Sequence, residues 1–163
     1  MADTAGYSGT PLGRKLGLKP GMRVRLLVGS GEDDASAYWD RFGPELDPGA
    51  FLILEAGIPE PADFTHLFVR SAADLREGVL RSRQGMTVDG MVWISWPKKS
   101  SSLESEIGRA EVMREGQAAG LVDVKVCAVD EDWSGLKFVI PVADRGLSLI
   151  HISEPTRQLT QSR

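Results

Sequence analysis

Short runs of apolar residues, bounded by turn residues, recur along the chain. They occupy residues 22–29, 50–55, 64–70 and 90–96, and each is closed by Gly, Pro or polar residues. Continuous apolar runs of this length are typical of strands that are buried on both faces of a sheet. The pattern therefore predicts four strands, of which the last contains the sequence "VWISW".

Two segments between or after these runs carry apolar residues at helical spacing. Residues 71–85 and 101–120 each begin at a serine that stands three positions before an acidic residue, and each ends at a glycine. This spacing is typical of a capped helix start, and glycine is the usual residue after a helix end. The serine–acid pairs are Ser71 with Asp74 and Ser101 with Glu104, and the stripe in the second helix is Leu103, Ile107 and Ala110.

The region after the second predicted helix has a different period. In "LVDVKVCAV" (121–129) the valines alternate with polar residues and Cys127, which predicts a strand. The turn-rich "DEDWSG" then leads into a returning strand at 136–142, so we expect a hairpin at one edge of the sheet. Trp133 is expected to fold back onto the sheet as its anchor.

Taken together, these elements predict an α/β fold: a three-layer sandwich with a mostly parallel sheet and an antiparallel C-terminal edge hairpin. A parallel sheet with an antiparallel last strand is the arrangement of the Rossmann-like, methyltransferase-like fold. We expect an N-terminal arm at 1–21 and a single domain at 22–145. Residues 146–163 are expected to be a non-native or disordered tail, because "SLIHISEPTRQLTQSR" resembles a translated sequencing adapter.

Composition narrows the function classes. The 163 residues carry a net charge of −4, which gives no general attraction to nucleic acid or to anionic lipid. No apolar run approaches the length of a membrane span, and the start of the chain lacks the apolar stretch of a signal peptide. A single cysteine fits a reducing compartment, so we expect a cytoplasmic protein without an internal disulfide. The two histidines, His66 and His151, have no Cys partners at metal-ligand spacing, so no metal site is expected.

The end of the 90–96 strand is the strongest candidate for a binding site. Pro97 ends the strand, and Lys98, Lys99, Ser100 and Ser101 follow it at the carboxyl edge, where open α/β sheets bind ligands. Two ammonium groups beside the free amides of a helix start suit a carboxylate or a phosphate. The alternative is a surface turn with ordinary lysines, in which Ser101 serves only as a helix cap.

A second candidate is a nucleoside site above the first two strands. Gly29 and Gly31 form a G-x-G after the first strand, and Glu55 ends the second, where an acidic residue can bind ribose hydroxyls. The third glycine of a dinucleotide motif is absent, and Asp33 and Asp34 oppose a pyrophosphate. S-adenosylmethionine tolerates acidic neighbours better. A tight turn and a solvated carboxylate account for the same residues without a ligand.

Four phrases of the sequence carry a family resemblance. They are "AGYSGTPLGRKLGLKPGMRV", "HLFVRSAADL", "WISWPKK" and "GLVDVKVCAVDEDWSGLKFV". Together they resemble the bacterial family DUF3052, over about residues 5–145. The resemblance implies a small cytosolic bacterial protein with a Rossmann-like fold and no established activity, and it supplies no catalytic residues.

These features lead to two functional expectations. The first is a non-catalytic or regulatory domain that binds a small anionic ligand or a protein partner at the carboxyl edge, with the cofactor unknown. The alternative is a divergent S-adenosylmethionine-dependent methyltransferase. A nucleophilic pair of His66 and Cys127 would require the two side chains to be in contact.

Overall fold

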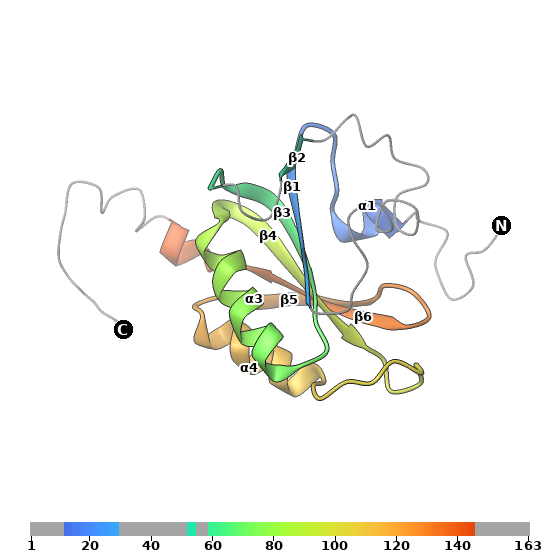
Figure 1. Ribbon diagram of the computed structural model, residues 1–163. Coiled ribbons are helices and arrows are strands. Elements are labelled where there is room, and N and C mark those ends of the chain that lie inside the picture. The colour runs from blue at the N-terminus through green and yellow to red at the C-terminus, as the bar shows by residue number, and fades with distance from the viewer. Residues whose placement is uncertain (1–11, 30–51, 55–58, 146–163) are drawn as a thin grey trace.

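The computed structural model describes residues 12–29, 52–54 and 59–145 (Figure 1). Within them a six-stranded sheet has the order β2-β1-β3-β4-β6-β5. The strands are β1 (Arg23–Val28), β2 (Leu52–Leu54), β3 (Ala62–Phe68), β4 (Met86–Pro97), β5 (Val122–Ala128) and β6 (Trp133–Val139). The helices are α1 (Leu12–Leu16), α3 (Ala72–Gln84) and α4 (Arg109–Ala118). The predicted strands and the α/β class are confirmed.

The sheet is mixed, which corrects the prediction of a mostly parallel one. The pairs β1·β2, β1·β3 and β3·β4 are parallel, whereas β4·β6 and β5·β6 are antiparallel. The connection from β5 to β6 covers only residues 129–132, and so short a link joins antiparallel strands, because a parallel pair needs a crossover. The predicted edge hairpin is present, with β6 inserted between β4 and β5.

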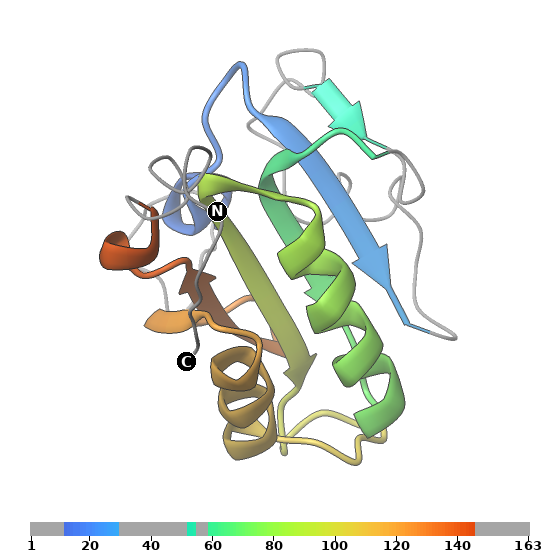
Figure 2. The same ribbon diagram turned by 90° about the vertical axis from the view of Figure 1, so that its left-hand side faces the viewer.

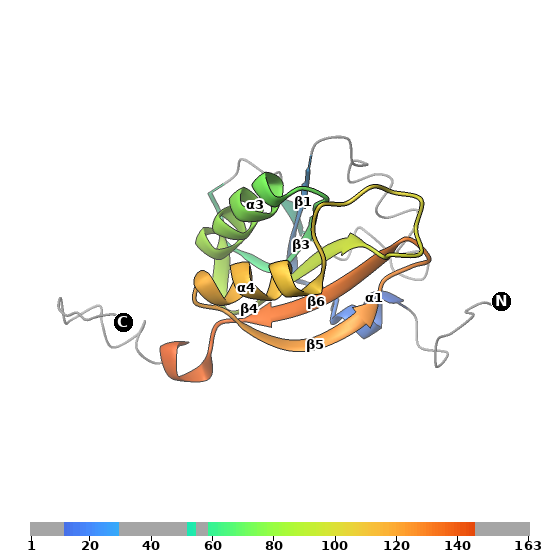
Figure 3. The same ribbon diagram turned by 90° about the horizontal axis from the view of Figure 1, so that it is seen from below.

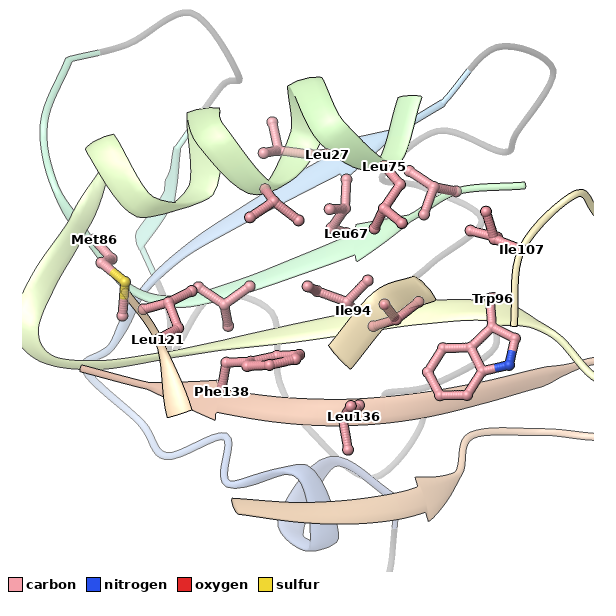
Figure 4. Packing of buried hydrophobic residues seen from close by; sticks show 14 of the residues in the cluster. Leu27, Leu67, Leu75, Met86, Ile94, Trp96, Ile107, Leu121, Leu136 and Phe138 are labelled. Carbon is pink, nitrogen blue, oxygen red and sulfur yellow. The ribbon is translucent and has the colours of Figure 1, made fainter. Parts of the chain in front are cut away.

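Helices cover both faces of the sheet. Figure 2 shows α3 and α4 in front of the strands, and α1 lies on the opposite face. Under α3 and α4, the larger core cluster joins side chains from four strands to the helices (Figure 4). It includes Leu27, Leu67, Ile94, Leu136 and Phe138. This packing is the main hydrophobic contribution to stability in the described part of the chain.

The helix α3 forms as its sequence predicts. The Ser71 hydroxyl accepts a hydrogen bond from the Asp74 amide at 3.1 Å, and Gly85 follows the last turn. Leu75 and Val79 are buried against the sheet, as their spacing predicts. The local signals and the packing therefore agree in this segment.

The prediction of a helix from Ser101 is wrong, because α4 begins at Arg109. The Ser101 hydroxyl donates to the Asp132 carboxylate at 2.9 Å and accepts from the Leu103 amide, so it closes a turn instead of a helix. The helix start is at Gly108, whose amide donates to Glu111 Oε1 at 2.8 Å. Residues 98–108 instead form the irregular connection between β4 and α4.

Part of the N-terminal arm covers the second face of the sheet. Trp93 Nε1 donates to the Leu16 carbonyl at 2.7 Å, and both residues are fully buried. Leu18, Val24 and Phe64 complete this smaller core cluster. Residues 12–18 thus pack with the sheet, although the sequence shows no long apolar run there.

The edge strand β5 exposes most of its apolar side chains. Val122, Val124 and Val126 are 41%, 52% and 48% exposed, whereas Cys127 is buried at 8%. The register shifts between Asp123 and Lys125, as at a bulge or another irregularity of the ladder. Bulges and lysines are common on edge strands because they discourage pairing with another chain.

Candidate functional site

A cavity of about 440 Å³ lies at the carboxyl edge of the sheet. It is formed by the connection between β3 and α3, the first turn of α3 and the connection 98–108, which Figure 2 shows passing beneath α3. Its lining residues are Arg70, Ser71, Asp74, Glu104, Ser105 and Glu106. This volume lies within the range of small-molecule sites.

Glu106 joins the two sides of this edge cavity. Its amide donates to the Arg70 carbonyl at 2.8 Å, and its carboxylate accepts from the Ala72 amide at 3.2 Å. The first amides of a helix favour a negative group. A carboxylate of the chain itself therefore occupies the start of α3, beside the Ser71 cap.

The charges of the edge cavity are mixed. Asp74, Glu104 and Glu106 contribute three carboxylates, and Arg70 contributes one guanidinium. Carboxylates accept hydrogen bonds from ammonium groups, and a guanidinium donates to carboxylates or phosphates. The lining is suited to a ligand that carries both a cationic and an anionic group.

The predicted anion residues lie on a neighbouring turn. The Lys98 amide donates to the Asp132 carbonyl at 2.8 Å, and the Ser101 amide donates to the Lys98 carbonyl at 3.0 Å. Lys99 and Ser100 are exposed. The predicted anion site depended on the free amides of a helix that starts at Ser101. Because α4 starts at Arg109, those amides do not lie beside Ser100 and Ser101. An anion bound here would meet the side chains of Lys98, Lys99 and Ser100, with the Asp132 carboxylate nearby on the Ser101 hydroxyl.

Of the predicted nucleoside residues, Gly29 is described, and Gly31 and Glu55 lie outside the described ranges. The Gly29 amide donates to the Phe68 carbonyl at 2.9 Å. A Cβ added to Gly29 would lie 2.7 Å from Asp74 Oδ2, so the glycine permits the carboxylate to approach the end of β1. The Asp74 carboxylate thus lies next to the turn where a nucleoside cofactor was predicted.

His66 and Cys127 do not form a nucleophilic pair. His66 Nε2 and Ser95 Oγ are 2.8 Å apart, both residues are fully buried, and the imidazole stacks on Phe68. Cys127 packs in the smaller core cluster and bonds the carbonyl of Ala128. Trp133, at 4% exposure, meets Phe68 edge-on at 5.1 Å between ring centres, which confirms its predicted anchoring role.

Sequence reasoning missed Arg70, Asp74 and Glu106. Arg70 follows a buried strand as Lys98 does, so its position at the carboxyl edge was a usable signal. Glu106 gave no such signal, because the sequence predicts a helix over residues 101–120 that contains it.

Among the described residues, no group of three or more His, Cys, Asp or Glu is arranged to hold a metal ion. None of the helices within the described ranges is long and apolar enough to span a membrane.

The sequence model of a family described as "Protein of unknown function (DUF3052)" matches residues 49–142. The chain belongs to the DUF3052 family. No curated protein matches it significantly in sequence. The match covers β2 to β6 and includes both the edge cavity and the hairpin.

Solved structures share the fold of this DUF3052 chain. A SAM-dependent methyltransferase from Aquifex aeolicus has a TM-score of 0.50 at 19% identity, covering 78% of this chain and 87% of its own. Magnesium protoporphyrin IX methyltransferase from Synechocystis PCC 6803, with bound SAH, has a TM-score of 0.50 at 9% identity, with 75% of each chain covered. LepI in complex with SAH and a substrate analogue reaches 0.51 at 12% identity, over 81% of this chain and 47% of its own. The likeness confirms the methyltransferase-like Rossmann fold.

Proposed function

We propose that this DUF3052 chain is a non-catalytic binding domain that takes a small ligand at the carboxyl edge of its sheet. The supporting observation is the edge cavity between the β3–α3 and β4–α4 connections, whose lining contains Arg70 and three carboxylates. Ligands of open α/β sheets bind outside the carboxyl ends of the strands. The cavity has the position and the volume for such a ligand.

The proposed ligand is small and carries an anionic group, with an ammonium or other cationic group at its other end. Arg70 binds the anionic group through paired N–H donors, and Lys98 and Lys99 on the neighbouring turn add positive charge. Asp74, Glu104 and Glu106 bind the cationic group. A purely anionic ligand such as a phosphate would meet three carboxylates, so a zwitterion of the amino-acid type fits better. A protein partner that inserts a zwitterionic group into the edge cavity is the alternative occupant.

Catalysis is not supported by the described side chains of the edge cavity. The Ser71 hydroxyl caps α3, the Ser105 hydroxyl donates to the Ile107 carbonyl at 2.8 Å, and Glu106 binds the Ala72 amide. These groups hold local structure and are not arranged as a nucleophile with its base. The buried pair His66–Ser95 has no exposed surface through which a substrate could reach it.

The alternative function is a divergent S-adenosylmethionine-dependent methyltransferase. Two observations favour it: the fold shared with SAM-dependent methyltransferases, and the Asp74 carboxylate beside Gly29, which could face a sulfonium or an ammonium group. Gly31 and Glu55 would then contact the cofactor, as predicted from the sequence.

Thermal-shift titration of the full chain tests the proposal. The ligands are free amino acids, phosphorylated metabolites, S-adenosylmethionine and SAH. A ligand at a hundred times its dissociation constant stabilises the native state by about 2.7 kcal/mol. We expect a zwitterion to raise the melting temperature, and we expect Arg70→Gln to abolish that rise. Arg76→Gln is the matched control, because Arg76 lies on α3 outside the cavity, 3.9 Å from Glu115.

The outcomes separate the two functions. A shift produced by zwitterions and lost only in Arg70→Gln supports the binding domain. A shift produced by S-adenosylmethionine and lost in Glu55→Ala supports the methyltransferase instead. If no small ligand shifts the wild-type chain, the small-ligand proposal is wrong.

A further inference from the structure

The hairpin places two lysines directly opposite each other. Lys125 on β5 pairs with Lys137 on β6 in the antiparallel register, so both side chains leave the same face of the sheet. Like charges at such a cross-strand pair destabilise a sheet. Two positive charges at this position therefore have a cost in the folded chain.

A third lysine adds to this charge. Burial lowers the pKa of Lys137, and the positive charges of Lys125 and Lys19 lower it further. Lys125 Nζ donates to the Lys15 carbonyl at 3.3 Å, which ties the hairpin to α1. In the described part of the chain, no carboxylate pairs with Lys19, Lys125 or Lys137.

This lysine patch (Lys19, Lys125 and Lys137) is separate from the edge cavity. Lys137 pairs with Trp93, whereas the carboxyl end of β4 is Pro97. Figure 3 shows α1 beside the hairpin, on the side of the sheet away from α3 and α4. The patch is therefore on the α1 face of the sheet, while the edge cavity borders α3.

We propose that the lysine patch binds an oligophosphate, a chain of two or three phosphate groups. Ammonium groups are compact charges that bind phosphate oxygens through charge-assisted hydrogen bonds. The chain has a net charge of −4, so general attraction does not draw anions to it. Within the described ranges, three lysines on one face that have no carboxylate partner are a local exception. A bound phosphate chain would replace the repulsion between the lysines with attraction. Inorganic polyphosphate and a nucleoside triphosphate both supply this group.

Calorimetric titration of the full chain with tripolyphosphate and with ATP tests the proposal. The Lys125→Gln/Lys137→Gln variant removes two charges from the patch. The matched control, Lys98→Gln/Lys99→Gln, removes two charges from the carboxyl edge. We expect the first variant to weaken tripolyphosphate binding by about tenfold or more and the control to leave it within about twofold. Without ligand, the first variant should melt at a higher temperature than the wild type, because the repulsion is gone.

Comparison of the two probes identifies the source of the phosphate. Similar affinities for ATP and tripolyphosphate assign the site to the phosphate chain alone, whereas much tighter binding of ATP assigns it to a nucleotide. The proposal is overturned if the wild type binds neither probe, or if both variants lose binding equally, which would indicate non-specific charge. Loss only in the Lys98→Gln/Lys99→Gln variant would overturn it in favour of the carboxyl-edge turn. Because these outcomes do not involve Arg70, they leave the proposed function to its own test.

Discussion

Replacing Gly116 by alanine should destabilise the chain, although alanine is the better helix former. Gly116 lies in α4 and is buried against β6. A Cβ at this position would lie 2.2 Å from Cε2 of Phe138 and 2.6 Å from its Cζ. Phe138 is fully buried in the larger core cluster, so a shift of its ring would disturb the packing of its neighbours.

The two opposing effects can be compared in magnitude. Alanine gains at most about 1 kcal/mol of helix propensity over glycine, and less near a helix end. Carbon atoms pack at about 3.5–4.0 Å, so the ring or the helix has to shift by more than about 1 Å. Such overpacking costs about 1–3 kcal/mol. The net result is a loss of up to about 3 kcal/mol, which corresponds to a melting temperature lower by up to about 12 °C.

Urea and thermal unfolding of Gly116→Ala, with Gly108→Ala as control, measure this effect. A Cβ at Gly108 would meet Glu111 Oε1 at an ordinary 3.6 Å, so the control should change stability by less than about 1 kcal/mol. In the double variant with Phe138→Leu, the smaller side chain makes room for the methyl group. The two changes together should therefore cost less than their sum, by about 0.5–3 kcal/mol. A Gly116→Ala chain as stable as the wild type would refute the close approach of α4 to β6.

Three other changes have expected outcomes. Burial raises the pKa of Asp63, but hydrogen bonds from Arg23 lower it more, so the net pKa is below its ordinary value. Asp63→Asn should therefore lower the urea midpoint at neutral pH, and the difference from wild type should disappear as the pH falls through the lowered pKa of Asp63. Trp93→Phe removes the bond to the Leu16 carbonyl and should cost roughly 1–3 kcal/mol in urea unfolding; an unchanged midpoint would contradict a buried bond there. Lys137→Met should raise the melting temperature at pH 7, because the lowered pKa of Lys137 means that folding penalises its charged form. The gain should shrink as the pH rises through the lowered pKa of Lys137, because the native lysine loses its proton before the unfolded one, and a gain that persisted would argue against the charge as the cause.

The proposed ligand site shows how much of a binding site can be predicted from the residues that follow each strand in the sequence. The rule that ligands of open α/β sheets bind at the carboxyl edge directs attention to the residues after each buried strand. Applied to β4 alone, this rule predicts Lys98 and Lys99 as the ligand-binding residues. The cavity instead adjoins the residue after the neighbouring strand, Arg70, because the connection 98–108 turns away from Lys98 and crosses the start of α3.

The local sequence was sufficient to predict an element where the residues of that segment alone decide its structure. The apolar runs of β3 and β4 predict buried strands, and the Ser71 cap with the Leu75 and Val79 spacing predicts α3. In these segments the period of the side chains, the cap and the terminating glycine all favour the same structure. The hairpin was also predictable, because its connection is too short for any crossover.

Tertiary structure decided the rest, because those features depend on contacts between residues distant in the chain. Ser101 has the spacing of a helix cap, but its hydroxyl donates a hydrogen bond to Asp132 in the hairpin turn. The helix α4 therefore starts eight residues later. The alternation in β5 indicates two faces, but only its position at the sheet edge exposes the valines and buries Cys127. Likewise, the repulsion between Lys125 and Lys137 exists only in the register of the hairpin. The sequence by itself determined the strands and α3, whereas the pairing of those elements determined the start of α4 and which side chains meet.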